Sequence, residues 1–287
     1  MAKPTILVTG ANGQLGRELQ VLAATHPQYH FIFADRTVLP IDDPHQVDAF
    51  FAAHHPTVCI NCAAYTAVDK AETDKEAAFR INGDAPGYLA AACHRHDAKL
   101  IHISTDYVFA GDSATPLSET DPTGPINTYG ASKLAGEEKA MENHPDGTVI
   151  IRTAWVYSEF GNNFVKTMIR LMKERPSINV VDDQLGSPTY AADLAATILE
   201  ILAYPLFIPG IYHYSNEGRI SWYQFALAIR DHLGSTCTVN PIPSSQFPTP
   251  AKRPHYSLLD KALIRNTYQL SIRDWETALA VCMSKIK

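Results

Sequence analysis

Tyr129 and Lys133 are the two residues whose types and spacing point most directly to chemistry. They are four residues apart in a segment, 127–137, whose pattern predicts a helix capped by Asn127 or Thr128, so both side chains rise from one face. A free phenol has a pKa of about 10, and a neighbouring ammonium favours the phenolate and lowers that pKa toward neutrality. The pair is therefore a candidate proton donor with its tuning partner.

Thr105 brings a hydroxyl group that suits the same chemistry. It follows the apolar run 100–104, which we expect to be a buried strand, and its hydroxyl would hold a substrate carbonyl near the phenol of Tyr129. A Tyr-x-x-x-Lys spacing alone is common on exposed helix faces. Its position after this strand, in a chain that begins with a glycine-rich turn, favours the catalytic interpretation.

The glycine-rich turn lies between an expected strand, 5–9, and an expected helix that begins near Leu15. Glycines in such a turn allow a sharp bend and bring the backbone close to a bound diphosphate, while the amino end of the helix offers free N–H groups. A strand, a turn and a helix in this order predict a dinucleotide site. Its expected contacts are Gly10, Asn12, Gly13, Gln14, Leu15 and Gly16.

Two further segments fit the same coenzyme. The second apolar run, 31–34, ends at Asp35 and Arg36, about twenty residues after the glycines. An acidic side chain at this place accepts a hydrogen bond from the adenosine ribose of NAD, whereas an arginine accommodates the 2′-phosphate of NADP, so both NADH and NADPH stay open. The contacts expected after the third strand, 57–61, are the small residues Ala63 and Ala64, with Tyr65.

Strands alternate with helices along the first part of the chain, which predicts an α/β fold with a Rossmann-like, doubly wound parallel sheet. The proline-rich end predicts a smaller C-terminal substrate-binding lobe. We expect a dinucleotide-binding domain over 1–155, to which the chain returns around 188–204, and a smaller lobe over 156–187 and 205–287. The other expected elements are helices at 43–55, 68–95 (broken near Gly83 and Pro86), 163–173 and 191–203, and strands at 148–152 and 178–181.

Composition excludes several functional classes. The 287 residues are 46% hydrophobic and 19% charged, as in ordinary globular proteins, and a net charge of -6 gives no basic surface for nucleic acid or membranes. The apolar stretch 194–208 contains Glu200 and Pro205, so it is too short and too broken to span a bilayer. Met1 runs almost directly into the first expected strand, so we expect no secretion signal and a cytoplasmic protein.

Neither the five cysteines nor the twelve histidines predict a metal or disulfide site. Cys59 and Cys62 form a C-x-x-C, but Cys59 lies inside an apolar run, so we interpret both as small buried residues and not as a redox pair. The histidines are scattered, and no cysteine or carboxylate joins them at metal-ligand spacing. We therefore expect no protein-built metal site.

Taken together, the hydroxyl, the tyrosine, the lysine and the glycine turn resemble the extended short-chain dehydrogenase/reductase superfamily, in which these groups act as a set. Within it, the chain resembles the dTDP-4-dehydrorhamnose reductase family from its first strand to about residue 190, with shorter cues at 186–189 and 253–254. The motifs that carry this resemblance are GQLG at 13–16, AAYTAVDKAE at 63–72, STDYVF at 104–109, YGxxK at 129–133, RTxWVY at 152–157 and GNNF at 161–164.

This resemblance implies a reaction and residue roles. It implies NADH- or NADPH-dependent reduction of the 4-keto group of dTDP-6-deoxy-L-lyxo-4-hexulose to dTDP-L-rhamnose, the last step in making an activated sugar for surface polysaccharide. Tyr129 would give the proton, Lys133 would tune it and hold the ribose, and Thr105 would orient the ketone. Val68, Tyr107 and Trp155 would line the sugar site and Arg253 would contact the diphosphate, although Trp155 could instead fill the gap between lobes and Arg253 could be a surface residue.

The resemblance also raises the question of a metal-bridged dimer. Some members of the family are thought to dimerise through magnesium bound by glutamates. Glu18 is present here, but the segment 190–193 contains no glutamate. We therefore expect no magnesium-bridged dimer, and a homodimer stays one alternative for the assembly.

Two rival interpretations remain at this level. One is a nucleotide-sugar dehydratase or epimerase of the same superfamily, but a dehydratase is expected to carry Asp-Glu after the threonine, and this chain has Asp106-Tyr107. The other is a regulatory subunit that binds NADP without catalysis, as in the related β subunit of methionine adenosyltransferase. The intact Tyr129 and Lys133 favour catalysis. Coenzyme preference, the nucleotide base and the pathway that the product feeds stay open.

Overall fold

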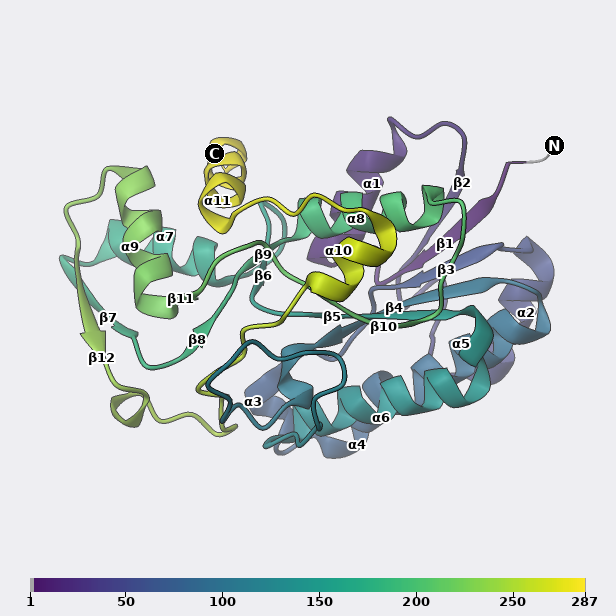
Figure 1. The fold of residues 1–287 in the computed structure, drawn as a ribbon, viewed down its shortest axis with the longest axis horizontal. Coiled ribbons are helices and arrows are strands. Elements are labelled where there is room, and N and C mark those ends of the chain that lie inside the picture. Colours follow the sequence, from purple (N-terminus) through teal and green to yellow (C-terminus); the bar gives the residue numbers. More distant parts are fainter. Residues whose placement is uncertain (1–2, 287) are drawn as a thin grey trace.

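A computed structural model describes residues 3–286. It has a large lobe built on a six-stranded sheet and a smaller lobe at one end of that sheet, seen at the left of Figure 1. The chain passes between the lobes more than once, and its C-terminal helix lies in the smaller lobe.

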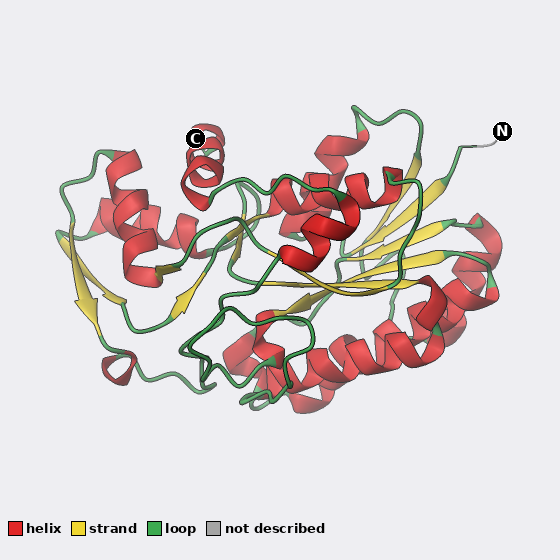
Figure 2. Ribbon diagram, in the orientation of Figure 1, coloured by secondary structure: helices red, strands yellow, loops and turns green. Residues whose placement is uncertain are grey.

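The large sheet is parallel throughout, with strand order β10-β5-β4-β3-β1-β2. This is the predicted Rossmann-like sheet, with β1 next to both β2 and β3 and crossovers on both faces (Figure 2). The strands are β1 (Thr5–Thr9), β2 (His30–Ala34), β3 (Val58–Asn61), β4 (Lys99–Thr105), β5 (Thr148–Thr153) and β10 (Gly210–Tyr214).

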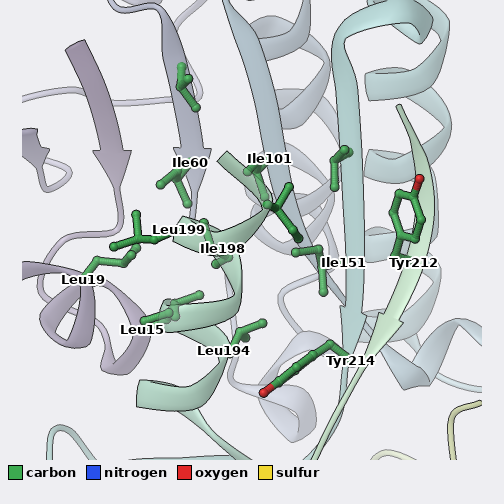
Figure 3. Packing of buried hydrophobic residues seen from close by; sticks show 14 of the residues in the cluster. Leu15, Leu19, Ile60, Ile101, Ile151, Leu194, Ile198, Leu199, Tyr212 and Tyr214 are labelled. Carbon is green, nitrogen blue, oxygen red and sulfur yellow. The ribbon is translucent and has the colours of Figure 1, made fainter. Parts of the chain in front are cut away.

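Helices cover both faces of this sheet because every central strand is apolar on both sides. In β1, Ile6 and Val8 face one helical layer and Leu7 faces the other, and all three are fully buried. One layer contains α1 (Gln14–Ala23), α8 (Ala191–Ala203) and α10 (Ala262–Tyr268), and its packing is drawn in Figure 3. The other contains α2 (Pro44–His54), α5 (Ala85–Arg95) and α6 (Thr128–Asn143).

The smaller lobe has a separate apolar core between helices, in which Val165, Phe225 and Leu279 are fully buried. Its helices are α7 (Phe164–Glu174), α9 (Trp222–Leu233) and α11 (Trp275–Lys285). Its short strands pair as β7 (Ser177–Val181) with β12 (Thr238–Ile242), β8 (Leu185–Gly186) with β11 (Ile220–Ser221), and β6 (Val156–Tyr157) with β9 (Thr189–Tyr190).

Most predicted strands and helices are present within a residue or two of their expected ends, with three differences. The helix predicted over 127–137 continues to Asn143 as α6. The pattern over 68–95 breaks into α3 (Val68–Ala71), α4 (Lys75–Phe79), a π-helical turn (Arg80–Asp84) and α5. Residues 210–214 and 262–268, which we placed with the smaller lobe, form β10 and α10 and pack on the large sheet. The prolines near these segments led us to place them in the smaller lobe. Tyr212 and Tyr214 of β10 are buried.

Other expectations concern cysteines, metals and membranes. The five cysteines are free thiols. Four of them, including Cys59, are buried, whereas Cys62, which we also expected to be buried, is half-buried. Residues 3–286 contain no group of three or more His, Cys, Asp or Glu side chains placed to hold a metal ion. Within the same residues, no helix is both long enough and apolar enough to cross a membrane.

Candidate active site

A cavity of about 1190 Å³ lies beyond the carboxyl ends of the sheet strands, where the fold predicts a ligand. Its walls come from both lobes. The predicted site residues that line it are Gly10, Asn12, Gly13, Gln14, Leu15, Asp35, Arg36, Ala63, Ala64, Tyr65, Val68, Thr105, Tyr107, Tyr129, Lys133 and Trp155.

The glycine turn has the geometry of a dinucleotide cradle. Gly10 adopts φ +65°, and a Cβ there would lie 2.6 Å from the backbone nitrogen of Ala63, so only glycine fits. Gly16 does not line the cavity but lets α1 pack closely, because a Cβ at that position would lie 2.5 Å from the carbonyl oxygen of Gly10. Gly13 is the N-cap of α1 and offers no side-chain acceptor, which leaves the first N–H groups of the helix free for an anion.

Asp35 is held firmly at the edge of this cradle. Its Oδ1 accepts hydrogen bonds from the backbone N–H and the hydroxyl of Thr37, and its Oδ2 accepts one from Asn12 Nδ2 at 2.8 Å. The Thr37 hydrogen bonds are the main reason that the pKa of Asp35 lies below its usual value. The carboxylate is therefore ionised and preorganised beside the expected ribose position, with Arg36 next to it in the cavity wall.

The loop after β3 is fixed by a residue that the sequence did not single out. Asn82, in the π-helical turn, accepts a hydrogen bond from the backbone N–H of Tyr65 at 2.8 Å and donates to its carbonyl oxygen at 3.0 Å. Its Nδ2 also donates to Ser132 Oγ at 3.0 Å, which ties the loop to α6. Ala63 and Ala64 thus present a fixed backbone to the cavity.

Thr105, Tyr129 and Lys133 all face this cavity, from β4 and α6. Asn127 caps α6 by accepting a hydrogen bond from the backbone N–H of Gly130. Removal from water raises the pKa of Tyr129 to about 12, although the Thr105 hydroxyl beside it favours the phenolate. The phenol therefore holds its proton, as a proton donor must.

The expected lowering of the Tyr129 pKa by Lys133 was wrong for this structure. Lys133 is 1% exposed, and its Nζ donates to the carbonyl oxygen of Ile103 at 2.6 Å. Burial lowers the pKa of Lys133 to about 8. Desolvation by burial is the largest cause of the pKa shifts of both Tyr129 and Lys133. The extent of this burial cannot be derived from the sequence.

Asp106 is a second residue that the sequence did not place in the site. It is 2% exposed, its Oδ1 accepts a hydrogen bond from Thr105 Oγ1 at 3.0 Å, and its Oδ2 has no hydrogen-bond partner among the described residues. Burial raises its pKa to about 7. The signal for Asp106 in the sequence was its position directly after Thr105. In the structure it lines the cavity.

The expected sugar site contains an aromatic wall. Tyr107 meets Tyr129 edge to face, with 5.6 Å between ring centroids. Trp155 stacks on Trp222 of the smaller lobe, with centroids 3.6 Å apart and rings 13° from parallel. Trp222 lines the cavity and was missed, because nothing in the sequence relates it to Trp155.

Arg253 is not among the residues that line the cavity. Its guanidinium pairs with Asp69, with Nη2 donating to Oδ2 at 2.8 Å, and it also donates to the carbonyl oxygen of Ala251. It lies beside Tyr107, whose side chain does face the cavity. A role toward the substrate diphosphate stays a prediction.

Glu18 occupies an interior position. It is 2% exposed, and its Oε1 accepts a hydrogen bond from Ser158 Oγ at 2.6 Å. Burial raises its pKa to about 7, with Glu159 nearby adding to the effect. This carboxyl group is turned inward between the two lobes.

Comparisons with known proteins agree over the whole chain. The family model described as RmlD substrate binding domain matches residues 4–287. The chain is 40% identical over 285 residues to a dTDP-4-dehydrorhamnose reductase of Aggregatibacter actinomycetemcomitans, covering 96% of each, and 41% identical over 293 residues to one of Burkholderia thailandensis, covering 97% of each. It is also similar to the crystal structure of dTDP-4-dehydrorhamnose reductase from Bacillus anthracis in complex with NADP, with a TM-score of 0.95, 41% identity, and coverage of 99% of this chain and 100% of that one.

Proposed function

Because the chain belongs to the RmlD substrate binding domain family, together with dTDP-4-dehydrorhamnose reductases, we propose that it catalyses their reaction through Thr105, Tyr129 and Lys133. The reaction is NADPH- or NADH-dependent reduction of the 4-keto group of dTDP-6-deoxy-L-lyxo-4-hexulose to dTDP-L-rhamnose. The observation that carries the proposal is the meeting of these three side chains with the glycine cradle in one cavity.

The reduced coenzyme, when bound, supplies the hydride for the sugar carbonyl carbon. The protein's part is proton transfer and orientation. Tyr129 donates its phenolic proton to the carbonyl oxygen. The Thr105 hydroxyl, which donates to Asp106 in the absence of substrate, turns to hold that oxygen by a hydrogen bond. Lys133 holds the ribose hydroxyls and, once charged, stabilises the phenolate that Tyr129 leaves behind.

Each part of the cavity then has a role. The backbone of Gly10 and Gly13 and the amino end of α1 suit the diphosphate of the coenzyme, and Asp35 or Arg36 suits its adenosine ribose. The remaining coenzyme contacts are Asn12, Gln14, Leu15, Ala63, Ala64 and Tyr65, while Gly16, predicted as a contact, supports the turn by letting α1 pack closely. The sugar contacts are Val68, Tyr107, Trp155 and the newly found Trp222. Arg253 lies outside the cavity lining but beside Tyr107, and we propose that it contacts the substrate diphosphate.

Two further proposals concern the cellular location and the assembly of the protein. We propose that the protein works in the cytoplasm, where its free thiols stay reduced. We also propose that any homodimer forms without a magnesium bridge, since Glu18 is buried. Sedimentation analysis with and without a chelator tests the second point, and a chelator-sensitive dimer contradicts it.

A substrate panel tests the reaction. dTDP-, UDP- and GDP-linked 4-keto sugars are each incubated with NADH and with NADPH, and the loss of reduced nicotinamide is compared with the product formed. We expect one coenzyme oxidised per dTDP sugar reduced. Turnover without net loss of reduced nicotinamide would indicate an epimerase or dehydratase, and no turnover of any ketone would favour the regulatory subunit.

A single substitution tests the proton donor. Tyr129→Phe removes only the hydroxyl, so we expect kcat to fall about 100- to 10,000-fold while coenzyme affinity stays within about threefold. Tyr88→Phe, on α5 and outside the cavity lining, is the matched control and keeps full activity. Unchanged turnover in Tyr129→Phe overturns the assignment.

A further inference from the structure

A row of buried polar side chains crosses the large sheet and ends at Lys133. Thr9 on β1, Asn61 on β3 and His102 on β4 are partners in the strand register, and each is at most 1% exposed. Thr9 Oγ1 lies 2.6 Å from Asn61 Oδ1, Asn61 Nδ2 lies 3.0 Å from His102 Nδ1, and His102 Nε2 lies 3.3 Å from Lys133 Nζ. Buried polar groups of this kind need complementary donors and acceptors throughout.

The orientation of the Asn61 amide is set by a backbone group. Its Oδ1 accepts hydrogen bonds from Thr9 Oγ1 and from the backbone N–H of Ala63, the latter at 3.2 Å. A backbone N–H can only donate, so the amide oxygen must face Ala63. Asn61 Nδ2 therefore faces the imidazole and donates to His102 Nδ1.

This donation decides where His102 carries its proton. Nδ1 accepts a hydrogen bond, so it has a free lone pair, and the single proton of a neutral imidazole lies on Nε2. Burial holds the pKa of His102 well below its usual value, so the ring takes no second proton. Nε2–H is thus a donor, and it points at Lys133 Nζ.

An ammonium group fits this environment less well than a neutral amine does. An ammonium has three donors and no acceptor, so it would face the Nε2–H of His102 donor to donor. A neutral amine accepts from His102 and still donates to the carbonyl oxygen of Ile103 at 2.6 Å. The other groups near Lys133 are the thiol of Cys62, the phenol of Tyr129, and the carboxylate of Glu137, which favours the ammonium but is paired with Arg152 of β5.

We propose that His102 is a positioning residue for Lys133: the hydrogen-bond chain from Thr9 through Asn61 and His102 weakens proton binding at Lys133, so that in mildly alkaline solution Lys133 is a neutral amine until coenzyme binds and then takes up a proton from solvent. The diphosphate of the coenzyme would supply negative charge near Lys133, and its ribose oxygens would accept hydrogen bonds. Both favour the ammonium form of Lys133. The second half of this proposal rests on the proposed function, because it requires a dinucleotide in the cradle. The first half concerns the protein alone.

Titration of Lys133 by NMR tests the first half directly. In coenzyme-free protein labelled with ¹³C at lysine, with Lys133 assigned by its absence from Lys133→Arg, we expect its pKa at about 8 or below. An ordinary lysine titrates at about 10.4, so a Lys133 that titrates there overturns the proposal. No substrate is needed, so this outcome is independent of the reductase assignment.

Two substitutions change the proton donor that faces Lys133. His102→Gln allows an amide oxygen to face the lysine without adding charge. Asn61→Asp offers an oxygen to Ala63 and another to the imidazole, which moves the His102 proton to Nδ1 and frees Nε2 to accept from an ammonium. We expect each to raise the proton affinity of Lys133 at least tenfold.

Thr9→Val is the matched control. It removes the far end of the chain, but the backbone N–H of Ala63 still orients Asn61, so Lys133 should titrate within about twofold of its original affinity. If neither test variant changes the titration, His102 does not position Lys133. If only Asn61→Asp changes it, the added charge explains the result and the proposal fails.

Calorimetry tests the second half, and its decisive measurement uses the original protein. NADPH binding is measured in buffers of different ionisation enthalpy at pH about 8 to 9, above the range of ordinary carboxyl groups and histidines. We expect uptake of a substantial fraction of one proton by the original protein and little by His102→Gln. Binding without proton uptake in the original protein overturns this half, whatever the NMR titration shows.

Discussion

Trp155 and Trp222 stack face to face, with ring centroids 3.6 Å apart, although 67 positions separate them in the chain. Trp155 lies between β5 of the large sheet and β6, and Trp222 begins α9 of the smaller lobe. Trp155 adopts φ +50°, a left-handed conformation that is strained for a bulky residue. A Cβ at Gly186 would lie 3.0 Å from the Trp155 ring, so the space for this indole depends on glycine. The surrounding structure thus forces Trp155 into the cavity wall, as strained residues at functional sites commonly are.

The stack predicts a role for Trp222 in substrate affinity. In Trp222→Leu, the indole of Trp155 loses its aromatic support, so we expect KM for the nucleotide sugar to rise about three- to tenfold while coenzyme affinity stays within about twofold. Steady-state kinetics with each substrate varied measures both. The far-UV circular dichroism couplet of the stacked indoles should vanish as well.

Trp275→Phe is the control for that substitution, because Trp275 packs in the smaller lobe away from the cavity lining. It should keep both KM values and the couplet. An unchanged KM for the sugar in Trp222→Leu, with the couplet lost, would show that the stack forms but does not support substrate binding.

The parts of the site that sequence predicted depend on local patterns. Tyr129 and Lys133 share a helix face because of their four-residue spacing, and the glycine turn follows a strand directly, so each motif is readable within a short window. Thr105 was found in the same way, at the end of an apolar run. The parallel sheet followed from the alternation of such runs with helical patterns.

The parts that sequence missed depend on contacts between distant segments. Asn61 and His102 meet only because β3 and β4 pair in one particular register, and Trp222 reaches Trp155 only when the lobes come together. Neither relationship has a spacing that a single sequence reveals. The pKa of Tyr129 was misjudged for a related reason, since desolvation depends on the complete cavity.

The buried ion pair between α6 and β5 predicts a large effect on stability. Glu137 and Arg152 are 2% and 3% exposed and are joined at 2.7 Å, while Ser104, next to Thr105, also donates to Glu137. Arg152→Met leaves a buried carboxylate without its cation, so we expect the free energy of unfolding in urea to fall by about 3–5 kcal/mol. Glu137→Met combined with Arg152→Met should lose less than Arg152→Met alone.

The exposed pair of Arg170 and Glu174 provides the comparison for this effect. Arg170→Met should change the free energy of unfolding by less than about 1 kcal/mol. A loss in Arg152→Met no greater than that in Arg170→Met would mean that the buried pair contributes nothing specific.

Asp35 predicts the direction of a coenzyme switch. In Asp35→Asn, the amide oxygen can still accept from Thr37 and keep the loop in place, but the negative charge is lost. A neutral side chain binds the ribose hydroxyl of NADH less well and repels the 2′-phosphate of NADPH less, so we expect the ratio of Kd for NADH to Kd for NADPH to rise about tenfold. Asp42→Asn, a cavity residue paired with Arg80, is the control, and an unchanged ratio in Asp35→Asn contradicts the role given to this carboxylate.

The buried Glu18 predicts how stability depends on pH. Its pKa is about 7 in the folded protein and about 4.5 when exposed, so between these values the folded state binds more protons than the unfolded state. The free energy of unfolding should therefore fall as pH rises from about 4.5 to 7, by roughly 1–3 kcal/mol. Glu18→Gln mimics the protonated acid and still accepts from Ser158, so urea unfolding across this range should show a flatter pH dependence than the original protein. The exposed Glu138→Gln should leave the slope unchanged, and an equally steep slope in Glu18→Gln would mean that another group is responsible.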